Sequence, residues 1–314
     1  MSIFGAAIRG FGATLGSPRL VIGLWLVNLV VALPVAGLMG ASIGSAVGGS
    51  VVDENLRDGF DMYWFGEYRE EARGIETSFT PTLTGAGAFY NNLEAWSNGR
   101  LFSEYLPLVG VGILYGLLWS FLMGGVLDRF ARPSESAVRA RFAQASGIYF
   151  FRFLRLALIS AVLYFLIFWL HRWMFDWLES LTRDMTREWS VLWSSLSVYL
   201  LTAFLLTLVH MSFGYAKIAT VVENRRVMLL AALRGLGFVL SFPGKTFGLY
   251  YGLVAVGAIM LALYSVVAPG AGQSHFVTIF LAFLVGQLFL IAKLIMRLTL
   301  YGAQTNLFKA LASR

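Results

Sequence analysis

The residue types that usually build catalytic or metal sites are scarce in this sequence. It contains three histidines (His171, His210 and His275), no cysteine, and neither an HExxH nor a GxSxG motif. No Asp or Glu lies in the middle of a long apolar stretch, so a carboxylate pair or a metal cluster cannot be built there. The glycine cluster at positions 10, 12 and 16 lacks the strand and the lysine of a phosphate-binding loop. We therefore expect no enzyme activity, no metal and no cofactor.

Four basic residues at the edges of apolar stretches are the remaining candidates for a binding site. Arg152 and Arg155 lie near the start of one stretch, and Lys293 and Arg297 lie near the end of another. Charged groups at such positions are costly in hydrocarbon and often functional, which favours a tentative site for an anionic lipid or another anion. The alternative is that their long stems lie along apolar surface while the cations reach the headgroups. Both interpretations remain open.

The composition places these residues in a membrane protein. Of 314 residues, 58% are hydrophobic and only 13% are charged, and the mean hydropathy is +0.72. A soluble domain usually has about a quarter of its residues charged. Crossing a bilayer takes about 20 apolar residues, and six stretches reach that length. They are 20–47, 106–127, 148–170, 191–213, 247–268 and 276–300. We predict an all-α protein with one six-helix transmembrane domain over residues 1–314.

Charge is distributed unequally between the segments that connect the spans. The termini, the loops 128–147 and 215–246 and the adjoining span ends hold 17 of the 24 Lys and Arg residues, with three acids. The 48–105 and 171–190 connections hold the other seven basic residues and 14 acids. The positive-inside rule then predicts both termini in the cytoplasm. The basic residues fit anionic headgroups, so we expect membrane lipids and no nucleic acid as partners.

An internal repeat links the beginning of the chain to its second half. Residues 6–26 (AAIRGFGATLGSPRLVIGLWL) align without gaps to residues 231–251 (AALRGLGFVLSFPGKTFGLYY) with nine identities in 21 positions. In each copy an apolar segment with one Arg leads through Pro to a span, which is typical of an amphipathic helix on the cytoplasmic surface. The identical pairs are Ala6/Ala231, Ala7/Ala232, Arg9/Arg234, Gly10/Gly235, Gly12/Gly237, Leu15/Leu240, Pro18/Pro243, Gly23/Gly248 and Leu24/Leu249.

A third, degenerate copy at residues 138–158 would divide the six spans into three repeated hairpins. Arg139 and Arg141 precede an apolar run there, and Arg152 begins the next span. Each hairpin would contain a surface helix, a span outward, an outer loop and a span back. Chance matches among abundant Gly, Ala and Leu are the alternative. Repeats of a whole hairpin keep one orientation, unlike the inverted repeats of many transporters.

The repeat and the phrase at 216–239 (AKIATVVENRRVMLLAALRGLGFV) carry a family resemblance. The chain resembles the bacterial six-helix integral membrane proteins like the glycerophosphoryl diester phosphodiesterase membrane domain. The resemblance implies six helices with surface helices before the outward spans. In some relatives a soluble phosphodiesterase domain follows this module, and we expect that chemistry to be absent from these 314 residues.

Two connections are expected on the outer face. The 48–105 loop is acidic, and its residues 51–73 mix charged and aromatic side chains, which favours an amphipathic helix there. A Pro/Gly/Thr turn region is predicted over 77–87 and a second short helix over 91–105. It could bind another envelope protein or simply cover the hairpins. The 171–190 segment, with three Trp residues, predicts another amphipathic helix within an aromatic belt.

Small residues at intervals of four predict where the spans pack closely. One set shares a face of the first span, and the other shares a face of the fifth. We expect packing within the chain, with a homodimer as the alternative. The two sets are Gly40, Gly44 and Gly48, and Gly244, Gly248 and Gly252.

These patterns predict a non-enzymatic protein that serves as an accessory, scaffold or lipid-organising component of the envelope. The alternative is a transporter or permease-like subunit for a lipid or amphipathic anion, using the four basic residues named above. A lipid-modifying enzyme would require His210 to meet an acid in three dimensions.

Overall fold

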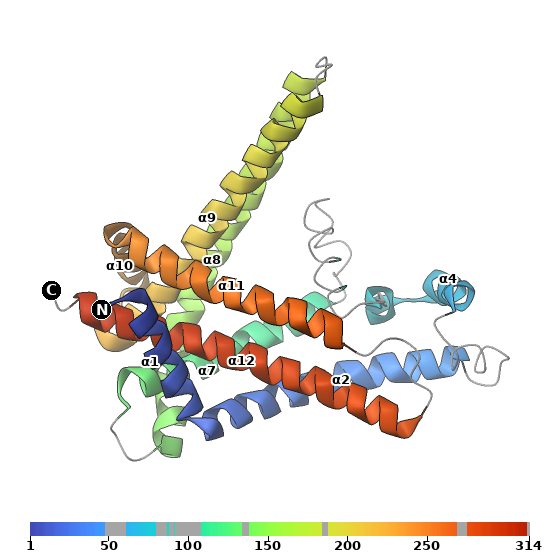
Figure 1. The fold of residues 1–314 in the computed structure, drawn as a ribbon, viewed down its shortest axis with the longest axis horizontal. Coiled ribbons are helices and arrows are strands. Elements are labelled where there is room, and N and C mark those ends of the chain that lie inside the picture. Colours follow the sequence, from blue (N-terminus) through green and yellow to red (C-terminus); the bar gives the residue numbers. More distant parts are fainter. Residues whose placement is uncertain are drawn as a thin grey trace. The chain divides into compact units, whose positions relative to one another are not determined.

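The structure, a computed structural model, describes residues 1–47, 61–79, 87, 91, 108–133, 138–183, 188–268 and 275–312. Within these ranges it contains helices and short turns and no strand, so the all-α prediction is confirmed there. Figure 1 shows the elements in chain order. They are α1 (Ile3–Leu15), α2 (Pro18–Val47), α4 (Met62–Glu71), the 3-10 helix η1 (Gly74–Ser78), α7 (Val109–Ala131), α8 (Val138–Thr182), α9 (Glu188–Val222), α10 (Met228–Ser241), α11 (Pro243–Val267) and α12 (Phe276–Ala312).

Six of the described helices are long and apolar enough to cross a membrane, as the sequence predicts. They are α2, α7, α8, α9, α11 and α12. Large apolar side chains along them are exposed, for example Leu158, Val162 and Phe165 on α8. Such surface is stable against lipid tails and unstable in water, so the chain has the helices of a multi-pass membrane protein.

The predicted outer helix at 171–190 is wrong in one respect, because the segment does not form a separate helix. Helix α8 continues without interruption to Thr182, and the end of the segment belongs to α9, which begins at Glu188. The physical reason is the sequence 148–182, which has neither Gly nor Pro to end a helix. Hydropathy marks where a helix becomes polar, whereas the backbone hydrogen bonds continue beyond that point.

The described chain divides into two compact units, which we treat separately. Unit 1 contains residues 1–13, 117–252 and 298–314, and unit 2 contains residues 14–116 and 253–297. Several helices therefore contribute to both units.

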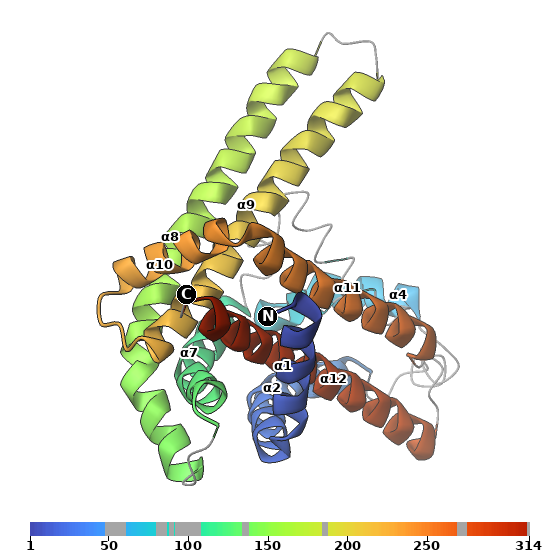
Figure 2. The ribbon, with the colours of Figure 1, turned by 60° about the vertical axis from the view of Figure 1, so that its left-hand side comes forward.

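Unit 1 is built around α8, α9 and α10. Helices α8 and α9 run side by side in opposite directions, and α10 packs along α9 (Figures 1 and 2). The ring of Phe238 on α10 lies 4.8 Å from the ring of Tyr215 on α9 and 4.8 Å from that of Phe308 on α12. Because all three rings are buried, they form an aromatic core that joins these helices.

Glycines let helix backbones touch at three places in unit 1. A Cβ added to Gly10 would lie 2.6 Å from the carbonyl oxygen of Thr299, and one added to Gly235 would lie 2.7 Å from the amide nitrogen of Ala216. A Cβ added to Gly124 would lie 2.8 Å from the carbonyl oxygen of Ala145. These distances leave no room for a side chain, so α1 lies directly on α12, α10 on α9, and α7 on α8.

Proline explains why α1 and α10 end as short helices, whereas the first turns of α8 continue into a long one. Pro18 and Pro243 are the first residues of α2 and α11. Proline favours this position because an amide hydrogen there would have no partner within the helix. The same missing hydrogen prevents the preceding helix from continuing through the proline. In the third predicted copy the aligned residue is Phe150, and α8 runs through it unbroken.

The predicted glycine faces of the spans contact little within the described residues. A Cβ on Gly40, Gly44, Gly244 or Gly252 would meet no described atom within 4 Å. A Cβ on Gly248 would meet only the side chain of Ile3, and Gly48 lies outside the described residues. The packing role of these six glycines therefore stays a prediction.

Unit 2 contains α2, α4 and η1. Asp61 caps α4 by accepting bonds from the amides of Tyr63 and Trp64. Tyr68 is buried, and its hydroxyl lies 3.1 Å from that of Ser42 on α2. This described part of the 48–105 loop therefore packs on α2, while the predicted helix at 91–105 lies almost wholly outside the described residues.

Candidate functional site

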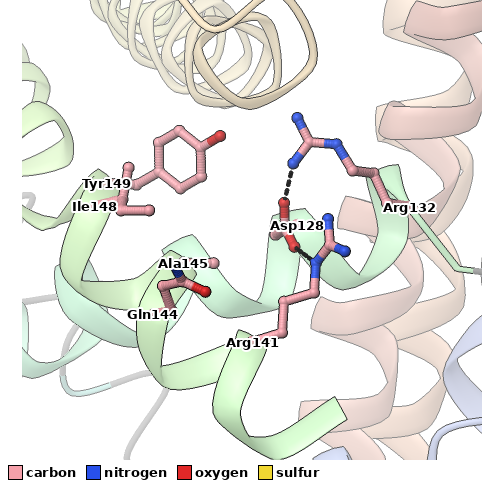
Figure 3. Close-up of a pocket in the computed structure, with 7 residues that line it drawn as sticks. All are labelled: Asp128, Arg132, Arg141, Gln144, Ala145, Ile148 and Tyr149. Carbon is pink, nitrogen blue, oxygen red and sulfur yellow. Dashed lines mark hydrogen bonds and ion pairs between the residues drawn. The ribbon is translucent and has the colours of Figure 1, made fainter. Parts of the chain in front are cut away.

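A buried carboxylate at the end of α7 pairs with two arginines. Asp128 accepts a bond of 2.5 Å from Nη1 of Arg132 and a bond of 2.9 Å from Nε of Arg141 (Figure 3). Its side chain is only 6% exposed, so the arginines offset the cost of removing the carboxylate from water. Arg132 follows α7 directly and Arg141 lies in the first turn of α8. We call these three residues the Asp128 cluster.

A cavity of about 350 Å³ opens beside the Asp128 cluster. Tyr149, which is 5% exposed, points its hydroxyl into this space from the side opposite Arg132 (Figure 3). That hydroxyl forms no hydrogen bond with any residue in the described ranges, although the ring packs tightly. The cavity therefore presents two guanidinium groups, one carboxylate and an unused hydroxyl, and is lined by Asp128, Arg132, Arg141, Gln144, Ala145, Ile148 and Tyr149.

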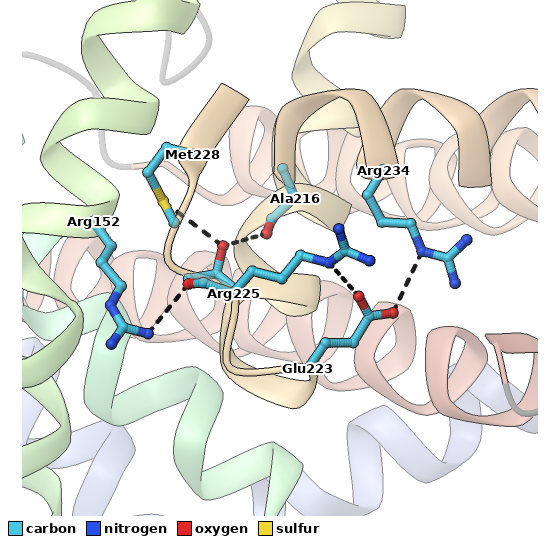
Figure 4. Close-up of polar contacts among 7 residues, drawn as sticks. Arg152, Ala216, Glu223, Arg225, Met228 and Arg234 are labelled. Carbon is cyan, nitrogen blue, oxygen red and sulfur yellow. Dashed lines mark hydrogen bonds and ion pairs between the residues drawn. The ribbon is translucent and has the colours of Figure 1, made fainter. Parts of the chain in front are cut away.

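A second carboxylate, at the end of α9, makes a similar arrangement. Glu223 binds Arg225 through one oxygen, and its other oxygen lies 3.4 Å from Nε of Arg234 on α10 (Figure 4). The Glu223 side chain is 25% exposed. We call these residues the Glu223 cluster. In both clusters the acid lies at the C-terminal end of a long helix, binds a nearby Arg and reaches an Arg of the next helix.

Arg152, a predicted site residue, stabilises a turn. Its Nη1 donates to Oδ1 of Asn224 at 2.8 Å. It also donates to the carbonyl oxygen of Arg225 at 3.2 Å (Figure 4). Asn224 has a φ of 50°, a left-handed conformation that Asn tolerates better than most residues. The guanidinium carbon also lies 5.4 Å from the centre of the Tyr149 ring. Arg152 thus connects α8 to the turn between α9 and α10.

The other three predicted basic residues do not share this environment. Arg155 is exposed on α8 in unit 1. Lys293 and Arg297 are exposed on α12 and belong to unit 2. A lipid or anion site made by all four residues stays a prediction.

Sequence reasoning missed Asp128 and Glu223, although a signal was present. The segments predicted to be cytoplasmic hold only three acids among 17 basic residues, and these two acids are among them. Each precedes a repeat-aligned arginine, Arg141 or Arg234, by 11 to 13 residues. An acid that is surrounded in the sequence by many basic residues is expected to form an ion pair with one of them.

Three pairs of polar side chains join the described spans. Tyr115 donates to Oδ1 of Asn28 at 2.7 Å and Trp25 donates to Oε1 of Gln287 at 2.9 Å, both within unit 2. Nδ1 of His171 lies 2.8 Å from the hydroxyl of Thr202 in unit 1. Across the described residues no group of three His, Asp or Glu side chains is suited to a metal.

Comparison with protein-family models, with curated proteins and with solved structures found no match to this chain. The resemblance to the glycerophosphoryl diester phosphodiesterase membrane domain therefore remains a prediction, and the candidate site depends on its geometry.

Proposed function

We propose that this chain is a non-enzymatic integral protein of a bacterial inner membrane that organises the lipid around it. In this proposal the spans form three repeated hairpins with both termini in the cytoplasm, and α1 and α10 lie in the inner headgroup layer.

The observation that carries the proposal is the shared surface pattern of α1 and α10. At aligned positions, Ile8 and Leu233 are 54% and 56% exposed, and Leu15 and Leu240 are 52% and 59% exposed. An exposed apolar stripe on a short helix next to spans is typical of helices that lie in the interface plane. Such a helix inserts into one leaflet and changes the lipid packing there.

The opposite faces of the two helices support the repeat. Ala6 and Ala231 are both fully buried, and Gly10 and Gly235 both touch the backbone of a long helix. The aligned residues Arg9 and Arg234 lie beside the apolar stripes, where a guanidinium reaches anionic headgroups. The contact of α7 with the first turns of α8 supports a third copy, since it also joins one hairpin to the next.

The depth of these helices in a bilayer tests the proposal. Because the chain has no cysteine, single spin labels can be attached after Ile8→Cys or Leu233→Cys, with Arg226→Cys as the control in the exposed α9–α10 turn. In nanodiscs we expect electron paramagnetic resonance to show labels 8 and 233 accessible to oxygen and shielded from a water-soluble nickel complex. The control label should show the reverse. Equal exposure of all three labels to nickel would contradict the interfacial position.

The lipid-organising role has a separate test. Lipids that remain bound after purification from a native membrane should be enriched in anionic species relative to that membrane, as quantified by mass spectrometry. Bound lipid with the bulk composition would contradict the proposal. Protein-dependent movement of a labelled anionic lipid between liposome leaflets would favour the transporter alternative instead.

A further inference from the structure

We propose that the cavity beside the Asp128 cluster binds the phosphate group of a net-anionic lipid headgroup. The proposal specifies a ligand for the function proposed above and rests on it for the position of the cavity in the membrane. It concerns residues of unit 1 alone.

The charges in the cavity favour an anion. Asp128 neutralises one of the two guanidinium groups and holds both at defined positions, at 2.5 and 2.9 Å. Two guanidinium groups and one carboxylate therefore line a space of about 350 Å³. Arginine matches phosphate well because its planar fork donates two parallel hydrogen bonds. Within the described residues Arg132 bonds to Asp128 through Nη1, so its Nε and Nη2 can face a ligand.

Two neutral groups complete the donor set. The Tyr149 hydroxyl faces the cavity without a partner among the described residues, although its ring is almost wholly buried (Figure 3). Gln144 lines the same space and carries an amide donor. A phosphate has enough acceptor oxygens to bind the guanidinium, the hydroxyl and the amide at once.

The position of the cavity along α8 favours a lipid over a soluble phosphate. The lining residues Arg141, Ala145 and Ile148 follow one another on a face of this helix, and the apolar stretch predicted from the sequence begins at Ile148. Seven residues of helix cover about 10 Å, close to the thickness of a headgroup layer. Ile148 and Phe151 are exposed on α8 just beyond the polar wall, so an acyl chain can continue along apolar surface.

The test measures lipid binding to the full-length protein in a neutral detergent by native mass spectrometry. The probes are dioctanoyl phosphatidylglycerol, dioctanoyl phosphatidylcholine and inorganic phosphate. We expect phosphatidylglycerol to bind at least about tenfold more tightly than phosphatidylcholine, because the guanidinium groups that line the cavity repel the choline cation.

The decisive variant is Tyr149→Phe, which removes one hydroxyl and keeps the buried ring. It should weaken phosphatidylglycerol binding about fivefold to tenfold, since a hydrogen bond to a charged group is lost. Tyr215→Phe is the matched control, because the Tyr215 hydroxyl likewise has no partner in the described structure but is buried outside the cavity lining. Arg132→Lys, which keeps the charge beside Asp128, should weaken binding about fivefold, and Arg225→Lys should leave it unchanged.

Equal binding of the two lipids, or equal losses in Tyr149→Phe and Tyr215→Phe, would overturn the proposal. Inorganic phosphate that binds as tightly as phosphatidylglycerol would assign the cavity to a soluble phosphate and overturn the lipid source. These outcomes are separate from the spin-label result: α1 and α10 can lie in the interface while the cavity stays empty, and a failure of the interfacial position would be seen at labels 8 and 233.

Discussion

Two junctions between helices, α7–α8 and α9–α10, both depend on glycine. They differ in which helix of the pair supplies it. At the second junction the glycine, Gly235, belongs to the later helix and touches the backbone of α9. At the first, Gly124 and Gly125 belong to the earlier helix, and the later helix contributes Phe142 against Gly125. In the repeat alignment Phe142 occupies the position of Gly235. Close backbone contact therefore requires a small residue on one partner, and either helix can supply it.

The acids of the two junctions differ in burial. The side chain of Asp128 is 6% exposed, whereas that of Glu223 is 25% exposed, although each binds two arginines. Since water screens the more exposed pair, the loss of its charge should cost less. The α7–α8 junction should thus depend more on its ion pairs, and the α9–α10 junction more on its glycine contact.

The largest expected effect is at Asp128. Asp128→Asn leaves two arginines without their carboxylate in a mostly buried site and should lower the free energy of unfolding by about 3 kcal/mol. Equilibrium unfolding in mixed micelles, followed by circular dichroism, measures this change. A loss no greater than that of the Glu223 variant below would contradict the difference in burial.

Gly235→Ala should have the next largest effect. The added Cβ overlaps the backbone of α9 at Ala216, so α10 must move and the unfolding free energy should fall by about 2 kcal/mol. Gly237→Ala is the control, because a Cβ there meets no described atom within 4 Å. That change should stabilise the helix by up to about 1 kcal/mol, since alanine favours helices over glycine. If both variants lose stability equally, the backbone contact is not the cause.

Gly10→Ala tests whether the α1–α12 contact matches the α9–α10 contact. We expect a loss of about 1 to 2 kcal/mol, smaller than at Gly235 because a Cβ at Gly10 would overlap the backbone of α12 less deeply than a Cβ at Gly235 overlaps α9 at Ser212. Its aligned control, Gly12→Ala, should show no loss, because no described atom lies near that position. Thermal unfolding of the four glycine variants in one detergent gives the comparison. Reversal of the order between Gly10 and Gly12 would remove support for the repeat.

Glu223→Gln should have the smallest effect of the four. The partly exposed carboxylate is lost while the amide keeps one acceptor for Arg225, so the unfolding free energy should fall by about 1 kcal/mol or less. The loss should shrink further in high salt, because exposed ion pairs are screened. Salt titration of the unfolding midpoint measures this, and a salt-independent loss would indicate a buried pair.

The sequence was a good guide to the spans and a poor guide to their contacts. Length and apolarity are local properties, so all six spans could be predicted, including the one at 247–268 that becomes most of α11. The end of α8 could not be predicted, because hydropathy changes at residue 170 while the helix continues to Thr182. The glycine spacing of 40 and 44 showed that close packing was possible, whereas the observed contacts use Gly10, Gly124 and Gly235.

The candidate site shows the same limit. Arg152 was predictable as a costly cation near a span, but its bond to Asn224 joins residues 72 positions apart. The cavity beside Asp128 likewise depends on how the first turns of α8 approach the end of α7.

Amino-acid composition and order alone account for the solvent of this protein and for its helices. A chain with 13% charged residues and six long apolar stretches must bury those stretches in lipid, and the backbone must then hydrogen-bond within each helix. The tertiary structure decided which glycines become contacts, which arginines meet an acid, and where a cavity remains. These outcomes depend on distances between helices, because hydrogen bonds, ion pairs and packing act over only a few ångströms and join residues that the sequence separates.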